Sequence, residues 1–328
     1  MAGPSIQLDR VTKKYGATVA VRDLSMQIEP GEMFGLIGPD GAGKTTSIRL
    51  ICGLVKTDGG HVRVVGRDPV KEHRQVTQEL GYLSQRFSLY GDLSIDENIA
   101  FFAEIHGLNM RAPAIRERRE RLLELTQLTK FRSRLADQLS GGMKQKLALA
   151  CTLVHEPKII LLDEPTTGVD PVSRREFWKL LSEFLAQGIT ILMTTPYLDE
   201  AERCTRVALL HEGVLIALDT PANLRASLPG DVMEVIAADR DGATAALGQL
   251  SGVADVQLFG ERAHVRLEPH SPMRDPERLE AALRSAGVAA ESVRRVPASL
   301  EDVFIARVTP AENVAKDEKA EKATKDTV

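Results

Sequence analysis

Residues 38–45 have the composition and spacing of a loop that holds phosphate groups. They read GPDGAGKT, which matches GxxxxGK[ST], and they follow an apolar run at 33–37. Glycines let backbone amides turn toward a triphosphate, Lys44 can reach its terminal phosphates, and the Thr45 hydroxyl can ligate Mg²⁺. A flexible glycine turn is the ordinary alternative. The residues expected to contact the nucleotide here are Gly38, Pro39, Asp40, Gly41, Ala42, Gly43, Lys44, Thr45 and Thr46.

A second segment, residues 159–164, ends an apolar run with two carboxylates. The letters IILLDE indicate a buried parallel strand, and ligands bind at the carboxyl ends of such strands. Asp163 suits the second sphere of Mg²⁺, and Glu164 is placed to orient and polarise a water that attacks phosphorus. Taken alone, the two acids could instead cap the next turn.

Residues 139–145 read LSGGMKQ and precede a helical run. Ser140 and the amides of Gly141 and Gly142 would form a second phosphate-binding concavity at the helix start, although a glycine helix cap is the alternative. This segment resembles the signature of ATP-binding-cassette (ABC) proteins. The resemblance implies a P-loop NTPase cassette that uses ATP and Mg²⁺, and it extends from Ile6 to about Leu228.

Further positions match the same family in order. The resemblance implies that Tyr15 stacks on adenine and that the loop 168–170 faces the dimer interface. It also implies that Gln85 senses Mg²⁺ and the membrane partner. Gln85 is therefore counted with Lys44 and Glu164 among the catalytic residues. Each has an ordinary alternative: a core tyrosine, a surface glutamine and a helix cap at Asp170.

One position departs from the family pattern. Residues 194–201, TTPYLDEA, resemble the switch loop, but Pro196 stands where the family has a histidine. Proline donates no hydrogen bond, so the transition state would lose a contact. Two explanations remain open: hydrolysis persists with Thr195 or a water as donor, which we favour, or ATP is bound tightly and turned over slowly.

The helices and strands that must position these residues are predicted to form an α/β fold with a small second domain. We expect a cassette over residues 1–228, with a helical insertion at about 94–155 that opens with a Ser94–Glu97 capping box. Residues 229–309 show the βαββαβ order of a ferredoxin-like α+β domain, serving dimerisation or regulation. Its strands are expected at 232–237, 254–259, 263–267 and about 292–296, with a last helix from Ser299. The charged tail 310–328 is expected to be disordered or a fraying helix.

Composition excludes several classes of protein. Hydrophobic residues make up 43%, charged residues 27%, and the net charge is -4, without the basic excess of a nucleic-acid binder. No apolar run approaches the roughly 20 residues of a membrane span, and the N-terminus lacks a secretory pattern. Cys52, Cys151 and Cys204 form no CxxC pair and suit reduced core positions. A cytoplasmic location is therefore expected.

The resemblance also implies partners. Two cassettes, as a homodimer or a pair of related subunits, would sandwich ATP head to tail and drive a separate integral membrane permease, to which the chain would be peripheral on the inner face. Gln85 to Leu93, with Phe87, Leu89 and Tyr90, is the expected permease contact, or else a small satellite core. Residues 297–304 resemble the ending of ABC-2 exporter cassettes for drugs, polysaccharides or lipids. The rival interpretations are a cassette ATPase of DNA repair or the ribosome, and a regulatory module that never hydrolyses.

Overall fold

The computed structural model describes residues 3–85 and 89–308, and its contacts divide the chain into two compact units, Met1–Leu218 and Asp219–Val328. The sequence places this division at residue 228, whereas α8 (Pro221–Ala226) belongs to the second unit. Phe87 and the tail 310–328 lie outside the described residues.

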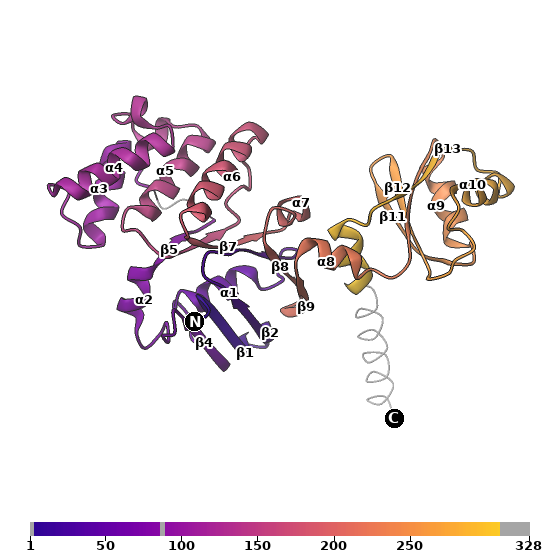
Figure 1. Cartoon of the computed structure of the whole chain (residues 1–328), viewed down its shortest axis with the longest axis horizontal. Helices are drawn as coiled ribbons and strands as arrows, with labels where there is room; N and C mark the ends of the chain where they lie inside the picture. The colour runs from indigo at the N-terminus through magenta and orange to yellow at the C-terminus, as the bar shows by residue number, and fades with distance from the viewer. Residues whose placement is uncertain (1–2, 86–88, 309–328) are drawn as a thin grey trace. The chain divides into compact units, whose positions relative to one another are not determined.

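A six-stranded sheet forms the centre of the first unit (Figure 1). Its strand order is β5-β6-β7-β3-β8-β9, and the pairs from β5 to β8 are parallel. Every residue of β3, β6 and β7 is buried, as expected for parallel strands covered on both faces. The bounds are β3 (Met33–Ile37), β5 (Leu80–Leu83), β6 (Ile159–Asp163), β7 (Thr190–Thr195), β8 (Arg206–His211) and β9 (Val214–Asp219).

An antiparallel sheet of three strands, in the order β2-β1-β4, completes the strand part of this unit. The strands are β1 (Ile6–Tyr15), β2 (Thr18–Ile28) and β4 (Gly59–Val64). Helix α1 (Lys44–Ile51) contacts β2 and β4 of this sheet and β6 of the other. The two sheets therefore share one apolar core around α1, which includes Ile6, Leu24, Ile48, Ile51 and Leu161.

The chain between β5 and β6 forms helices. Helix α5 (Gly141–Leu153) contacts α3 (Ile95–Ile105), α4 (Pro113–Leu125), α6 (Pro171–Ala186) and β5, and the four helices gather in one cluster (Figure 1). The Ser94–Glu97 capping box forms as predicted. Shorter helices are α2 (His73–Glu79), α7 (Leu198–Ala201) and the 3₁₀ turns Thr129–Phe131 and Ala136–Gln138.

The second unit has the predicted order of elements, strand, helix, strand, strand, helix, strand. Its antiparallel sheet runs β11-β12-β10-β13, and helices α9 and α10 contact the sheet strands. A last helix follows at 300–308. Ser299 caps this helix, because its hydroxyl accepts from the Asp302 amide. The Asp302 carboxylate in turn accepts hydrogen bonds from the Ser299 amide and from His264. The elements are β10 (Val232–Ala237), α9 (Arg240–Gly248), β11 (Val253–Phe259), β12 (Arg262–Leu267), α10 (Pro276–Ser285) and β13 (Ala290–Val296).

Candidate functional site

The predicted phosphate loop (residues 38–45) and the acidic strand end meet at the carboxyl edge of the parallel sheet. The Lys44 ammonium group lies 3.1 Å from Glu164 Oε1 and donates to the Gly38 carbonyl at 2.8 Å. Thr45 Oγ1 donates to Asp163 Oδ1 at 3.1 Å. Lys44, Asp163 and Glu164 are only 4%, 1% and 9% exposed, so their charges act on one another with little screening by water. Four of the residues chosen from sequence therefore converge on one buried cluster.

Glu164 is held from several sides. Its backbone has a positive φ of 50°, which is uncommon for a residue with a side chain, and its amide donates to Thr194 Oγ1 at 3.0 Å. The side-chain amide of Gln85 donates to Glu164 Oε2 at 3.0 Å. Gln85 therefore contacts the carboxylate expected to position water, and it does so from an exposed position after β5.

Thr194 is a site residue that the sequence reasoning missed. Its hydroxyl donates to Asp163 Oδ1 at 2.7 Å and accepts from the Glu164 amide, so it links the two acids. The available signal was its place near the carboxyl end of β7, the strand beside β6 in the sheet. Alternation along β7 alone did not indicate which of two consecutive threonines faces the acids.

Two glycines set the shape of the phosphate loop because other backbone segments approach them closely. A Cβ atom at Gly38 would lie 2.2 Å from the Leu210 carbonyl oxygen of β8. A Cβ atom at Gly43 would lie 2.4 Å from the Ala20 carbonyl oxygen of β2, and Gly43 also has a φ of +99°. No side chain fits at either place without moving a strand. Asp40, by contrast, is almost fully exposed.

Burial around Asp163 also affects neighbouring groups. Burial, reinforced by the negative charge of Asp163, raises the pKa of the Cys52 thiol to about 12 and the pKa of Tyr82 to about 12. Both groups are therefore neutral at physiological pH. The three cysteines are free and buried, as the sequence indicates, and burial raises the pKa of each thiol.

Comparisons with known proteins agree with this geometry. A family model described as "ABC transporter" matches residues 21–167. The Nod factor export ATP-binding protein I of Paraburkholderia xenovorans (strain LB400) is 37% identical over 316 residues, which cover 93% of this chain and 97% of the relative. The chain belongs to the ABC transporter ATP-binding proteins.

Other relatives extend the comparison. The daunorubicin resistance ATP-binding protein DrrA3 of Streptomyces coeruleorubidus is 35% identical over 311 residues, 93% of this chain and 96% of the relative. The probable multidrug ABC transporter ATP-binding protein YbhF of Escherichia coli (strain K12) is 43% identical over 226 residues, 69% of this chain. This chain spans 39% of the length of YbhF.

Solved ABC cassettes match about two thirds of this chain in fold. The structure of cbiO1 from Clostridium perfringens, part of the transporter complex cbiONQ, matches 69% of this chain and 92% of its own, with 28% identity and a TM-score of 0.63. The dimeric post-hydrolysis structure of the cassette MJ0796 bound to ADP and Pi matches 66% of this chain and 98% of its own, with 26% identity and a TM-score of 0.58. The predicted P-loop cassette fold is confirmed.

The ABC signature (residues 139–145) opens α5. Ser140 is the N-cap residue, and its hydroxyl accepts from the Met143 amide at 3.3 Å. Gly141 is exposed, and a Cβ atom there would meet no heavy atom within 4 Å apart from its immediate neighbours. Gly142 is buried, and a Cβ atom there would lie 2.2 Å from Ser173 Oγ of α6. Ser140 and Gly141 are therefore the exposed residues of the signature, whereas Gly142 is packed against α6.

Two further positions that match the family, Tyr15 and Asp170, lie in described parts of the chain. The Tyr15 ring is 46% exposed at the end of β1, with the Lys13 ammonium group 5.4 Å from its centroid. Tyr15 is therefore not a core tyrosine. Asp170 caps α6 by accepting from the amides of Val172 and Ser173, each at 3.0 Å. A hydrogen bond from the Ser173 side chain, together with these amide bonds, holds the pKa of the Asp170 carboxyl below its usual range.

The expectation that Thr195 could replace the missing switch histidine is not supported by its contacts. Thr195 is fully buried, and its hydroxyl donates to Glu200 Oε2 at 2.7 Å while accepting from the Tyr197 amide. A hydroxyl has one proton, and here that proton is directed to Glu200. Thr195 is therefore a support for the buried Glu200, which also accepts from Thr166 Oγ1.

The expected permease contact is only partly described, because Phe87 lies outside the described residues. Tyr90 is 45% exposed, and its ring packs edge-on against Phe101 of α3, with centroids 4.4 Å apart. Fully buried Asn98 holds this loop by bonding the Tyr90 amide and carbonyl and the Leu93 carbonyl. Ile105, at the end of the same helix, is 62% exposed.

Two features of the described residues bear on ligands and membranes. Among the described residues, none of the helices is both apolar enough and long enough to pass through a bilayer. Within the same part of the chain, His, Cys, Asp and Glu side chains do not gather in groups of three that could hold a metal ion. The expected Mg²⁺ site does not need such a group, because it also uses the hydroxyl of Thr45.

Proposed function

We propose that this chain hydrolyses ATP as one of two paired cassettes that drive a separate ABC-2 type export permease. The observation that carries the proposal is the contact of Lys44 and Gln85 with Glu164, beside the Thr45–Asp163 pair. A basic group for phosphate, hard oxygen ligands and a carboxylate for water are the parts that phosphoryl transfer requires.

The donor set fits Mg²⁺, which prefers oxygen ligands and retains several waters. The Thr45 hydroxyl would hold the ion, Asp163 would orient it from the second sphere, and the Gln85 amide oxygen could complete the set. When bound, Mg²⁺ would neutralise charge on the triphosphate. Glu164 would accept a hydrogen bond from the attacking water, and a phosphate that reaches Lys44 would replace Glu164 as its counter-ion.

Pairing follows from the exposed signature. Ser140 and Gly141 offer a capped helix start with open space in front of it, which is the kind of surface that binds phosphate. A second cassette related by a two-fold axis would bring its signature onto the ATP held by Lys44. Nucleotide then joins the two cassettes, and hydrolysis lets them separate.

The pairing can be tested with a Glu164→Gln variant, which keeps the shape of the site and removes the carboxylate. We expect it to bind Mg-ATP, to hydrolyse about 10²- to 10⁴-fold more slowly, and to form a dimer in solution scattering or crosslinking. The unmodified chain with Mg-ADP serves as the control. Only monomers at saturating Mg-ATP would contradict the proposal.

A regulatory cassette that does not hydrolyse ATP is the second candidate, and Pro196 favours it. Because the Thr195 proton is directed to Glu200, a water is the remaining donor for the role of the missing histidine. We expect the native chain to hydrolyse ATP, and Pro196→His to raise kcat less than tenfold. Phosphate release measured on both proteins decides: a gain of a hundredfold or more would support the regulatory role.

Membrane attachment would occur through the permease, at the cytoplasmic face. Tyr90 packs on Phe101, and Ile105 is exposed four residues further along the same helix, so a short permease helix would find apolar side chains there. Export is proposed because relatives named for Nod factor export and daunorubicin resistance span nearly the whole chain. Residues 229–309 would reinforce or regulate pairing, which a comparison of dimer formation with and without the second unit would reveal.

A further inference from the structure

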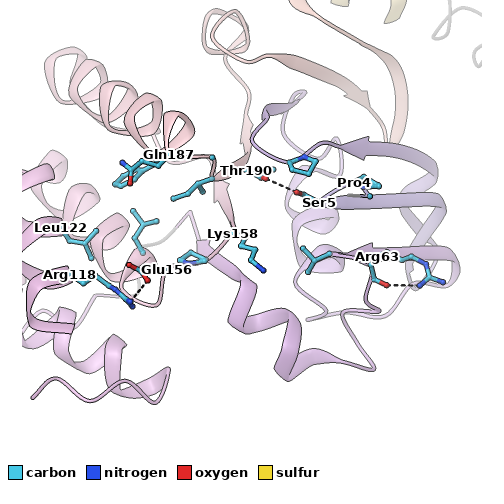
Figure 2. A pocket seen from close by; sticks show the side chains of 18 of the residues that line it. Pro4, Ser5, Arg63, Arg118, Leu122, Glu156, Lys158, Gln187 and Thr190 are labelled. Carbon is cyan, nitrogen blue, oxygen red and sulfur yellow. Dashed lines mark hydrogen bonds and ion pairs between the residues drawn. The ribbon is translucent and has the colours of Figure 1, made fainter. Parts of the chain in front are cut away.

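A cavity of about 870 Å³ opens at the end of the parallel sheet opposite to the catalytic acids (Figure 2). Lys158 and Thr190, which line it, stand at the start of β6 and β7, whereas Asp163 and Thr195 end those strands. At about 3.3 Å per residue, the five residues of β6 separate the two places by roughly 16 Å. The cavity is therefore distinct from the nucleotide site, and its volume suits a small molecule.

One wall of the cavity is apolar and belongs to the helical insertion and α6. Leu122, Leu153 and Phe184 are 6%, 3% and 3% exposed, and Leu125 and Ile189 extend the same surface. Figure 2 shows the opposite wall, where Pro4 and Ser5 precede β1 and Arg63 lies near the end of β4. A hydrogen bond of 3.1 Å between the hydroxyls of Ser5 and Thr190 joins the two walls.

The polar part of the lining is strongly basic. Four cationic side chains line the cavity against one carboxylate, that of Glu156; the four are Arg63, Arg118, Arg121 and Lys158.

Two of these cations already have acidic partners, and two do not. Arg118 pairs with Glu156, and Lys158 pairs with Glu79 at 3.0 Å. Arg121 donates instead to the side-chain oxygen of Gln187 at 2.8 Å, and Arg63 donates to the Gly66 carbonyl at 3.2 Å. Among the described residues no carboxylate forms an ion pair with either guanidinium group. An anion of a ligand would supply that missing charge.

We propose that this cavity binds a small amphipathic anion, with an aliphatic or aromatic body on the leucine and phenylalanine wall. Its carboxylate or phosphate group is held by Arg121, which lies on α4 next to Leu122, with Arg63 adding positive charge from the other wall. An uncharged body of the same length lacks this partner, and a free phosphate lacks the apolar contact. Both parts of the molecule are therefore needed for binding.

Isothermal titration of the full chain with decanoate, decyl phosphate, decanol and inorganic phosphate tests the proposal. We expect one saturable site for decanoate or decyl phosphate, and binding of decanol or inorganic phosphate at least about tenfold weaker. The tighter of the two anions shows whether the site prefers a carboxylate or a phosphate. Equal binding of decanoate and decanol, or no saturable binding by either anion, would overturn the proposal.

Variants of residues inside and outside the cavity show where the anion binds. Arg121→Gln should weaken the preferred anion by about tenfold, whereas Arg116→Gln, an exposed residue of the same helix outside the cavity lining, should leave it unchanged. Leu125→Trp should block the cavity. Equal weakening by Arg116→Gln would mean that only the general charge of α4 matters. Thermal unfolding midpoints establish that each variant is folded.

A last pair of measurements separates this site from the nucleotide site. Saturating Mg-ADP, or the variant Lys44→Ala, should leave the affinity for the anion unchanged. Loss of binding in both would place the anion on the phosphate loop and overturn the proposal. Failure of the proposed ATP hydrolysis would leave these binding results unaffected, so the two proposals can fail independently.

Discussion

The phosphate loop and the ABC signature are two helix starts with similar chemistry and opposite surroundings. In the phosphate loop, Lys44 and Thr45 are bonded to Glu164 and Asp163 of the same chain, and strands approach Gly38 and Gly43 from both sides. In the signature, the Ser140 hydroxyl accepts from the Met143 amide of its own helix, and a Cβ atom at Gly141 would meet no heavy atom within 4 Å outside its immediate neighbours and its own helix backbone. The contacts of the first surface lie within one chain, whereas the second is exposed at the start of α5.

The most demanding test of this comparison mixes two inactive chains. Lys44→Ala removes the phosphate contact, and Gly141→Asp places a negative charge on the open signature, so each variant alone should lose at least about 100-fold in ATPase rate. In an equimolar mixture, mixed dimers contain one site with Lys44 and Gly141 both intact. About a quarter of the native rate should therefore return, measured as phosphate release.

The matched control for this experiment mixes Lys44→Ala with Glu164→Gln. Both changes lie in the surface that one chain completes by itself, yet they reside on different chains in the mixed dimer. Each site then carries one defect, because Lys44 and Glu164 of a site come from the same chain. The mixture should regain no activity, and recovery equal to that of the first mixture would contradict the comparison.

The two signature glycines provide a smaller effect on stability. Gly142→Ala forces a Cβ atom against Ser173, so we expect a loss of about 1–3 kcal/mol in the free energy of unfolding. Gly141→Ala should change stability by less than about 1 kcal/mol, because its surroundings are open. Urea unfolding measures both. Adding Ser173→Gly to Gly142→Ala, with Ser173→Gly alone as reference, should recover part of the loss if the clash is its cause.

The smallest effect concerns a place that belongs to neither surface. His155 stacks on His106 with ring centroids 3.7 Å apart, and burial, followed by the charge of His106, lowers the pKa of His155 to about 4. In the unfolded chain, His155 takes up a proton near its ordinary pKa of 6.5. The contribution of neutral His155 to the free energy of unfolding is therefore complete above pH 6.5 and is lost as the pH falls from about 6.5 to 4.

This pH effect can be measured by urea unfolding at pH 7 and pH 5. We expect the native chain to lose roughly 1 kcal/mol more than His155→Phe, after allowance for partial exposure of the ring. His61→Gln, on an exposed position of β4, is the control and should behave as the native chain does. An equal loss in His155→Phe would assign the acid sensitivity to other groups.

The sequence predicts helices and strands well where all residues of a run are either buried or alternate regularly between buried and exposed positions. The wholly apolar run before Asp163 became a buried strand, and β10 has the predicted bounds, Val232–Ala237. The phosphate loop and acidic strand were recognised because their letters and spacing encode local geometry. Their convergence followed from the rule that parallel strands end at one edge.

The contacts that the sequence alone does not predict depend on long-range packing. Thr194 and Thr195 are consecutive, and only their placement against β6 and α7 directs one to Asp163 and the other to Glu200. The sequence places the boundary at residue 228 from a local signal, the Pro229–Gly230 break, whereas the contacts of the folded chain divide it after Leu218, so that α8 falls in the second unit. No spacing pattern indicated the cavity beside Lys158, since its lining comes from six separate stretches.

The close approach of β8 to the phosphate loop has a consequence for biosynthesis. Gly38 rests against the Leu210 carbonyl, and the Gly213 amide donates to the Ala42 carbonyl at 3.2 Å. These supports are translated more than 160 residues after the loop itself. A nascent polypeptide that has emerged only as far as Glu164 therefore carries the motif without its final conformation. We therefore expect the ability to bind nucleotide to appear late in synthesis, when the ribosome has already delivered most of the first unit.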